Sequence, residues 1–172
     1  MLPFTPIFEP LGSQHDRAAF HCGTEALDRY IHQQAGQDLR RHLAVPYVMV
    51  DPSARRIAGY YTLTNYSIDA GKLPMELTRR IPYPEVPATL IGRMAVDMDY
   101  RGQGFGGLLL MDALTRSLQN STFVASLAVV VDAIDESAIK FYQHYEFIPF
   151  PNHPDRLYLP MDTLKQLIHP EV

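Results

Sequence analysis

The sequence lacks several features that would assign it to a common class. Its single cysteine, Cys22, excludes an internal disulfide, is typical of a cytoplasmic protein and is expected to be a small core residue. No apolar run is long enough to span a bilayer, and Met1–Phe4 has neither the basic region nor the apolar core of a signal peptide. The seven histidines show no metal-ligand spacing, so we expect no metal site.

An excess of basic residues is also absent, since the formal net charge is −4. This balance argues against a general nucleic-acid-binding protein. The cations are nevertheless unevenly distributed, because the segment from Arg29 to Arg80 holds seven arginines and one lysine against four acids. Two interpretations stay open at this point: a solvated face with scattered cations, or a one-sided patch that contacts phosphates.

What the sequence does have is a turn rich in glycine between two apolar runs, Leu90–Val96 and Leu108–Leu118. The turn reads Arg101-Gly102-Gln103-Gly104-Phe105-Gly106-Gly107. Glycine allows consecutive backbone N–H groups to converge on one point, and a helix that follows adds free N–H groups and the positive end of its dipole. A loose helix start would explain the glycines less well, because they are costly in chain entropy. The turn therefore predicts a pyrophosphate site.

Two kinds of pyrophosphate site fit this turn poorly. A Walker loop is excluded because the sequence has no Gly-Lys-Ser/Thr. The glycines at 102, 104 and 107 match the dinucleotide fingerprint G-x-G-x-x-G, but the polar segment Asp97–Arg101 separates them from the strand. The chain after Asp132 is also too short for the rest of a doubly wound sheet.

The pattern Arg101-x-x-Gly104-x-Gly106, after a strand that ends Met94-Ala95-Val96-Asp97, resembles the GNAT superfamily of N-acyltransferases. Phe141-Tyr142, on a helix after the next strand, is similar to the Phe-Tyr pair of that family. The resemblance implies acetyl-CoA as the cofactor, its pyrophosphate on residues 101–107 and its acyl arm along Met94, Ala95 and Val96.

The resemblance also implies that Tyr142 protonates the departing thiolate as a general acid. A phenol with an ordinary pKa near 10 carries its proton at neutral pH and can donate it. The alternatives are an aromatic anchor at position 142, or Tyr145 as the acid. Backbone N–H groups along Met94–Val96 are expected to stabilise the negative charge that develops on the thioester oxygen. No convincing general base is present, although Asp132 and His42 are conceivable.

Four further segments look like one branch of the superfamily, the acetyltransferase toxins of toxin–antitoxin pairs: Phe20–Gly23, Leu27–Ile31, Ile91–Asp97 and Tyr158–Met161. That resemblance implies acetylation of the α-amino group of aminoacyl-tRNA, a small ribbon-helix-helix antitoxin as a partner, and a homodimer. The candidate contacts to tRNA phosphates are Arg29, Arg40, Arg41, Arg79, Arg80 and Arg93. Two other functions stay open: an N-acetyltransferase for a small amine such as a polyamine or a drug, and a non-catalytic module that binds coenzyme A.

The length and the apolar patterns predict one α+β domain over residues 1–172, with a mixed, mainly antiparallel sheet and flanking helices. The expected helices are 16–20, 24–42, 75–80, 106–120, 135–142 and 161–168, and the expected strands are 47–50, 57–63, 90–96, 124–132, 147–150 and 157–159. We expect Thr24 and Asp135 to cap their helices, and the segment 51–56 to join the first two strands in a hairpin. The resemblance implies that the strands carrying Val96 and Val131 splay apart. One position departs from the family, because Glu146 stands before Phe147 where the family has glycine. The tyrosine helix must therefore end differently or place Glu146 in a strained conformation.

Overall fold

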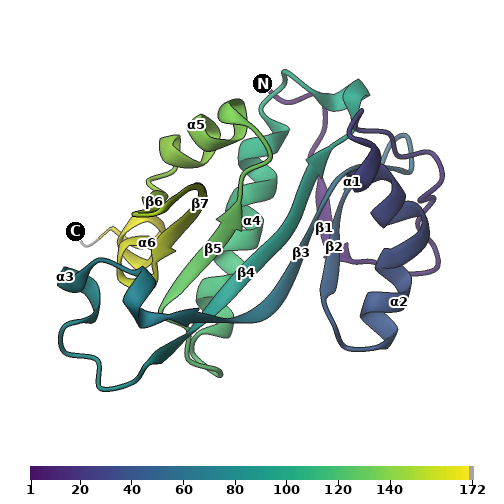
Figure 1. Cartoon of the computed structure of the whole chain (residues 1–172). Coiled ribbons are helices and arrows are strands. Elements are labelled where there is room, and N and C mark those ends of the chain that lie inside the picture. Colours follow the sequence, from purple (N-terminus) through teal and green to yellow (C-terminus); the bar gives the residue numbers. More distant parts are fainter. Residues whose placement is uncertain (171–172) are drawn as a thin grey trace. The chain divides into compact units, whose positions relative to one another are not determined.

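The computed structural model describes residues 1–170 and divides them between two compact units. The first unit combines Met1–Thr64 with Gly92–Ala113, and the second combines Asn65–Ile91 with the chain from Leu114 onward. Strands β3 (Arg56–Asp69) and β4 (Glu85–Val96) run through both units, and the strands follow the order β1-β2-β3-β4-β5-β7-β6 (Figure 1). The sheet is mixed and mainly antiparallel, which confirms the predicted fold class. The assignment of residues 1–172 to a single domain stays a prediction, and its last two residues lie outside the described part of the chain.

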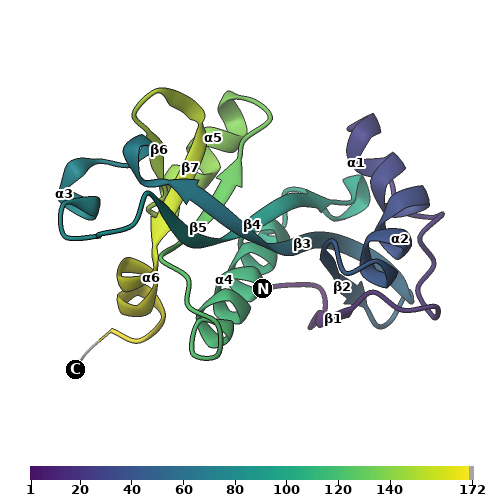
Figure 2. The same cartoon turned by 60° about the horizontal axis from the view of Figure 1, so that its bottom comes forward.

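The first unit begins with the antiparallel strands β1 (Ile7–Pro10), β2 (Val45–Asp51) and β3 (Figure 2). The predicted hairpin between the second and third strands is confirmed, with the turn at Asp51–Arg56. Strand β1 was not predicted, because four residues that end in proline show no clear alternation. The predicted helix at 16–20 is wrong: Phe20 N–H bonds Arg17 O in a single turn.

A helical segment covers one core of the first unit. It consists of α1 (Glu25–Arg29), a π-helical turn at Tyr30–Gln34 and α2 (Ala35–Arg40), close to the predicted range. Thr24 is the N-cap residue as predicted, but only its carbonyl takes part, accepting from Leu27 and Asp28 N–H. The buried stripe of this segment joins strand residues in a hydrophobic cluster that includes Phe20, Cys22, Tyr30, Ile31, Ala35, Val48 and Tyr60.

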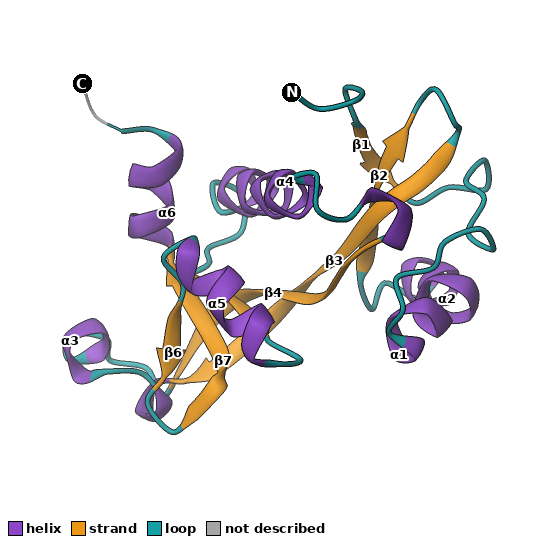
Figure 3. Cartoon of the chain, turned by 90° about the horizontal axis from the view of Figure 1, so that it is seen from above, coloured by secondary structure: helices purple, strands orange, loops and turns teal. Residues whose placement is uncertain are grey.

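The second unit contains β5 (Ala128–Asp132), which pairs antiparallel with β7 (His153–Pro160) (Figure 1). Strand β7 also pairs antiparallel with β6 (Ile148–Phe150) (Figure 3). Strand β5 also pairs in parallel with β4, through Thr89–Ile91 against Val129–Val131. The predicted strand at 124–132 starts late, because Val124 N–H bonds back to Asn120 O in a turn. The predicted splay of these strands stays a prediction.

The helices of the second unit lie close to their expected positions. They are α3 (Met75–Thr78), the C-terminal part of α4 (Phe105–Asn120), α5 (Glu136–His144) and α6 (Met161–Ile168). Asp135 caps α5 as predicted, since its Oδ1 accepts from Ala138 N–H at 2.8 Å. A second hydrophobic cluster includes Ile68, Val86, Ala88, Ala128, Val130, Phe150 and Tyr158. No helix within residues 1–170 has the length and apolar character required to cross a membrane.

Candidate active site

The glycine turn lies in the first unit, directly before α4. Gly102 and Gly104 adopt left-handed φ values of +73° and +87°, which only glycine takes without strain. A Cβ atom at either position would meet no heavy atom within 4 Å, so no side chain covers the backbone at these two glycines. The helix begins at Phe105, and the first bond into it runs from Leu108 N–H to Gly104 O. The N–H groups of the first helical turn therefore have no intrahelical partner and are available to an anion, which fits a diphosphate.

Two polar side chains of the turn contact the protein's own backbone. The Arg101 guanidinium donates to the carbonyl of Cys22, and Gln103 Nε2 donates to Asp99 O at 3.3 Å. Gly106 and Gly107 lie half-buried in the first turn of α4, and the Phe105 ring is buried. The turn thus presents mainly its backbone to a ligand, while its side chains fix its shape.

The strand residues Met94, Ala95 and Val96 come just before this turn in the same unit. Ala95 is buried, while Met94 and Val96 are half-buried. Directly before these residues, Arg93 N–H donates to the hydroxyl of Thr62 at 3.1 Å. This part of β4 is the segment expected to lie along an acyl arm.

Tyr142 lies on α5 in the second unit and is 7% exposed. Burial, followed by the negative charge of Asp132, raises the pKa of Tyr142 to about 12. Its hydroxyl makes no hydrogen bond with any residue in 1–170. Every fully buried side-chain oxygen of those residues has a hydrogen-bond partner, so the Tyr142 oxygen is not fully buried. The hydroxyl oxygen therefore reaches the surface with its proton unengaged, as a general acid requires.

The end of α5 fixes the position of Tyr142. Phe147 N–H bonds Tyr142 O at 3.2 Å, and Glu146 N–H bonds Gln143 O at 3.0 Å. These two bonds define a Schellman motif, and the Tyr142 and Phe147 rings pack 5.5 Å apart, as such motifs favour. Glu146 adopts a left-handed φ of +68°. The helix therefore ends as it would with glycine, and Glu146 takes the strained conformation.

The six arginines proposed as phosphate contacts are all exposed. The structure brings two of them together: Arg29 and Arg93 line a hollow of about 320 Å³ in the first unit, beside Tyr30 and Gln33. The Arg93 guanidinium lies 3.8 Å from the centre of the Tyr30 ring, and Tyr30 donates to Asp38 at 2.9 Å. Arg40 and Arg41 follow at the end of α2. Arg79 and Arg80 belong to the second unit, at the end of α3.

The two conceivable bases differ in their surroundings. Asp132 ends β5 and accepts from Arg156 through both oxygens, with Nε–Oδ1 at 2.7 Å and Nη2–Oδ2 at 3.0 Å. Arg156 also bonds the hydroxyl of Tyr66 and lies over its ring. These residues line a polar hollow of about 530 Å³ in the second unit. His42 is exposed, with φ +59°. Asp132 is thus already engaged in an ion pair.

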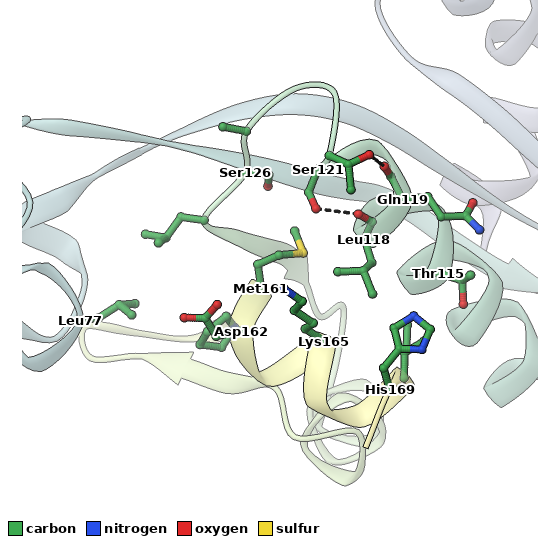
Figure 4. A pocket seen from close by; sticks show the side chains of 15 residues that line it. Leu77, Thr115, Leu118, Gln119, Ser121, Ser126, Met161, Asp162, Lys165 and His169 are labelled. Carbon is green, nitrogen blue, oxygen red and sulfur yellow. Dashed lines mark hydrogen bonds between the residues drawn. The ribbon is translucent and has the colours of Figure 1, made fainter. Parts of the chain in front are cut away.

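A larger hollow, of about 600 Å³, lies elsewhere in the second unit and is mostly apolar (Figure 4). Leu118, Ser121, Met161, Lys165 and His169 are among its lining residues. None of the predicted site residues lines it.

Cys22 was correctly predicted as a core residue: it is buried, and burial raises the pKa of its thiol to about 11. Within residues 1–170, no His, Cys, Asp and Glu side chains form a group that could hold a metal ion.

Comparison with protein families and curated proteins identifies one family model and two similar proteins. Residues 47–149 match the family model described as an acetyltransferase (GNAT) domain. A probable toxin TacT of Sinorhizobium fredii is 32% identical over 171 residues, which cover 94% of each protein. A tRNA-acetylating toxin of Mycobacterium tuberculosis is 32% identical over 154 residues, or 89% of this chain and 90% of that protein.

Solved structures agree with these matches over nearly the whole chain. AtaT complexed with acetyl-methionyl-tRNAfMet is 28% identical, with a TM-score of 0.87 over 95% of this chain and 99% of that one. The complex AtaTR bound with acetyl-CoA is also 28% identical, with a TM-score of 0.83 over 95% and 98%. A Tyr-to-Phe variant of KacT is 27% identical, with a TM-score of 0.88 over 94% and 98%.

Proposed function

Because the chain belongs to the GNAT acetyltransferase family and is an acetyl-CoA-dependent N-acetyltransferase, we propose that it acetylates the α-amino group of aminoacyl-tRNA and so blocks translation as a toxin. One observation of the structure carries the proposal: the open glycine turn at the N-terminus of α4, with left-handed Gly102 and Gly104. The names of the relatives support the choice of acceptor.

The backbone of residues 101–107 would hold the diphosphate of coenzyme A, and Met94–Val96 would contact its acyl arm. When bound, acetyl-CoA supplies an acetyl group activated as a thioester. The N–H groups of Met94–Val96 would stabilise negative charge on the thioester oxygen as the amine attacks. Tyr142 would donate its phenolic proton to the departing sulfur, because its pKa of about 12 keeps it protonated at neutral pH.

The acceptor RNA would be held by phosphate contacts. Arg29 and Arg93 already share one hollow, where a phosphate would meet two guanidinium groups beside the Tyr30 ring. We further propose a ribbon-helix-helix antitoxin as a partner, since one structure of AtaT includes the C-terminus of the antitoxin AtaR. We also propose a homodimeric assembly, which the resemblance to the toxin branch implies. An enzyme that acts on aminoacyl-tRNA would work in the cytoplasm.

The test is incubation of the protein with labelled acetyl-CoA and total charged tRNA, followed by identification of the labelled aminoacyl end. Tyr142→Phe should remove most of the label while leaving the affinity for coenzyme A unchanged. Tyr145→Phe, on the same helix, is the matched control and should retain activity. Unchanged turnover of Tyr142→Phe would reject the acid role.

Two other outcomes would replace the proposed acceptor or the activity. If a polyamine or another small amine is acetylated efficiently and charged tRNA is not, the protein is a small-molecule acetyltransferase. If coenzyme A binds but no amine in a broad panel is acetylated, the protein is a binding module. Growth arrest on expression of the wild type, but not of Tyr142→Phe, would connect the activity to toxicity.

A further inference from the structure

The segment that leads into the glycine turn, Asp97–Tyr100, makes hydrogen bonds to residues of the first unit that are distant in the sequence. Asp97 is only 1% exposed, although it carries a carboxylate. Its Oδ2 accepts from His21 N–H at 2.9 Å, and its Oδ1 accepts from Asp99 N–H at 2.9 Å. A buried carboxylate is stable only when hydrogen bonds and a nearby positive charge compensate its lost hydration.

Arg56, the first residue of β3, supplies that positive charge. Its Nη2 lies 3.4 Å from both oxygens of Asp97, and its Nη1 donates to Asp99 Oδ2 at 2.9 Å. One guanidinium thus bridges two carboxylates that are two residues apart. A planar fork with several N–H donors can make such a bridge, whereas a lysine ammonium presents a single charged centre.

A second set of contacts joins the same two segments. The Arg56 guanidinium lies 5.5 Å from the centre of the Tyr100 ring, within reach of a cation–π interaction. Tyr100 donates to Asp51 at 2.8 Å, and Asp51, the last residue of β2, pairs with Arg56 across the hairpin. The hairpin therefore contacts the carboxylates of Asp97 and Asp99 as well as the aromatic side chain of Tyr100.

We propose that Arg56 is a positioning residue for coenzyme A. Its side chain holds the Asp97–Tyr100 segment, so that the glycine turn keeps its shape before the cofactor binds. The inference rests on the proposed function, because it takes the glycine turn as the diphosphate site. Arg56 touches neither the reacting atoms nor the cofactor in this scheme. Its loss should weaken coenzyme A binding, since a mobile turn must be ordered on binding, and should leave the chemical step largely intact.

The test compares four proteins by calorimetric titration with coenzyme A: the wild type, Arg56→Gln, Arg56→Lys and Arg55→Gln. Arg55 is adjacent in the chain, exposed and of the same charge, so Arg55→Gln is the matched control. We expect Arg56→Gln to raise the Kd for coenzyme A about tenfold, a loss comparable to that of one charged hydrogen bond. Arg55→Gln should match the wild type, and Arg56→Lys should lie between them.

Steady-state kinetics provide a second readout that general destabilisation would not produce. In Arg56→Gln, the KM for acetyl-CoA should rise while kcat at saturation stays within about twofold of the wild type. Equal Kd values for Arg56→Gln and Arg55→Gln, or a fall in kcat with unchanged coenzyme A affinity, would overturn the inference.

Two further results keep the outcomes distinguishable. If Arg56→Gln does not fold, Arg56→Lys decides: at a wild-type melting temperature it must still bind coenzyme A more weakly than the wild type, or the inference is overturned. If the wild type itself does not bind coenzyme A, the proposed function fails, and the inference falls with it.

Discussion

Replacement of Glu146 by glycine tests how the end of α5 positions Tyr142. Glu146 is exposed and has a φ of +68°, which places its Cβ in conflict with its own backbone. The two capping bonds of this turn, Phe147 N–H to Tyr142 O and Glu146 N–H to Gln143 O, need that conformation. Glycine at 146 would keep both bonds and remove the strain.

The expected magnitude follows from two opposing effects. A left-handed conformation costs a residue other than glycine about 1–2 kcal/mol. Relief of this strain is offset by roughly 0.5–1 kcal/mol, because glycine gives the unfolded chain more conformational freedom. We therefore expect Glu146→Gly to raise the free energy of unfolding by about 0.5–1 kcal/mol. In a chain of this size the melting temperature should rise by about 1–4 °C.

The assay is thermal and urea unfolding of wild type and variant, with Gln143→Gly as the matched control. Gln143 is exposed inside the same helix, where glycine should lower stability by about 1 kcal/mol. The two glycine substitutions, three residues apart, should therefore shift stability in opposite directions. A Glu146→Gly variant no more stable than the wild type would refute the assignment of strain to this residue.

Three further predictions concern the cofactor turn, the RNA contacts and acid stability. Gly104→Ala should reduce coenzyme A affinity at least tenfold, measured by titration, because φ +87° is strained for alanine although its Cβ has open space. Arg93→Gln should weaken aminoacyl-tRNA binding and lower the slope of log K against log salt by about one. Burial acts to raise the pKa of Asp51, but hydrogen bonds from Ser53 and Tyr100 outweigh it and leave the pKa lowered. Its contribution to stability should therefore be complete above pH ~4 and disappear as the pH falls further, and Asp51→Asn should flatten that part of a melting-temperature profile.

Local chemistry made much of the fold predictable from the sequence. Gly102 and Gly104 identified the turn before α4, because backbone conformations with positive φ select glycine. Asp135 identified the start of α5 through a capping bond to a residue three positions later. The errors occurred where local signals are weak: a four-residue edge strand at Ile7–Pro10, and a single turn before Phe20 that resembled a short helix.

The support of the site could not be predicted, because it depends on contacts between residues far apart in the sequence. Arg56 and Asp97 are 41 positions apart, and Arg101 bonds the carbonyl of Cys22, which is 79 positions away. The segment Asp97-Met98-Asp99 was an available signal, since two acids beside a glycine turn that is proposed to bind an anion require compensation. Arg101 was expected to touch the cofactor, and this role stays a prediction beside the bond that its guanidinium makes to the protein.

The surroundings of Asp132 bear on which amines the protein can acetylate. Both of its oxygens accept from Arg156, so this carboxylate is a poor candidate for removing a proton from the acceptor. An acceptor that loses its proton without help is then favoured. An α-amino group with a pKa of 7.7–8.0 is about one-tenth to one-sixth neutral at pH 7, whereas a lysine side chain with a pKa near 10.4 is neutral in only about one molecule in 2,500. The difference, roughly 300-fold, favours the end of an aminoacyl-tRNA over a lysine side chain before any contact with the RNA is counted.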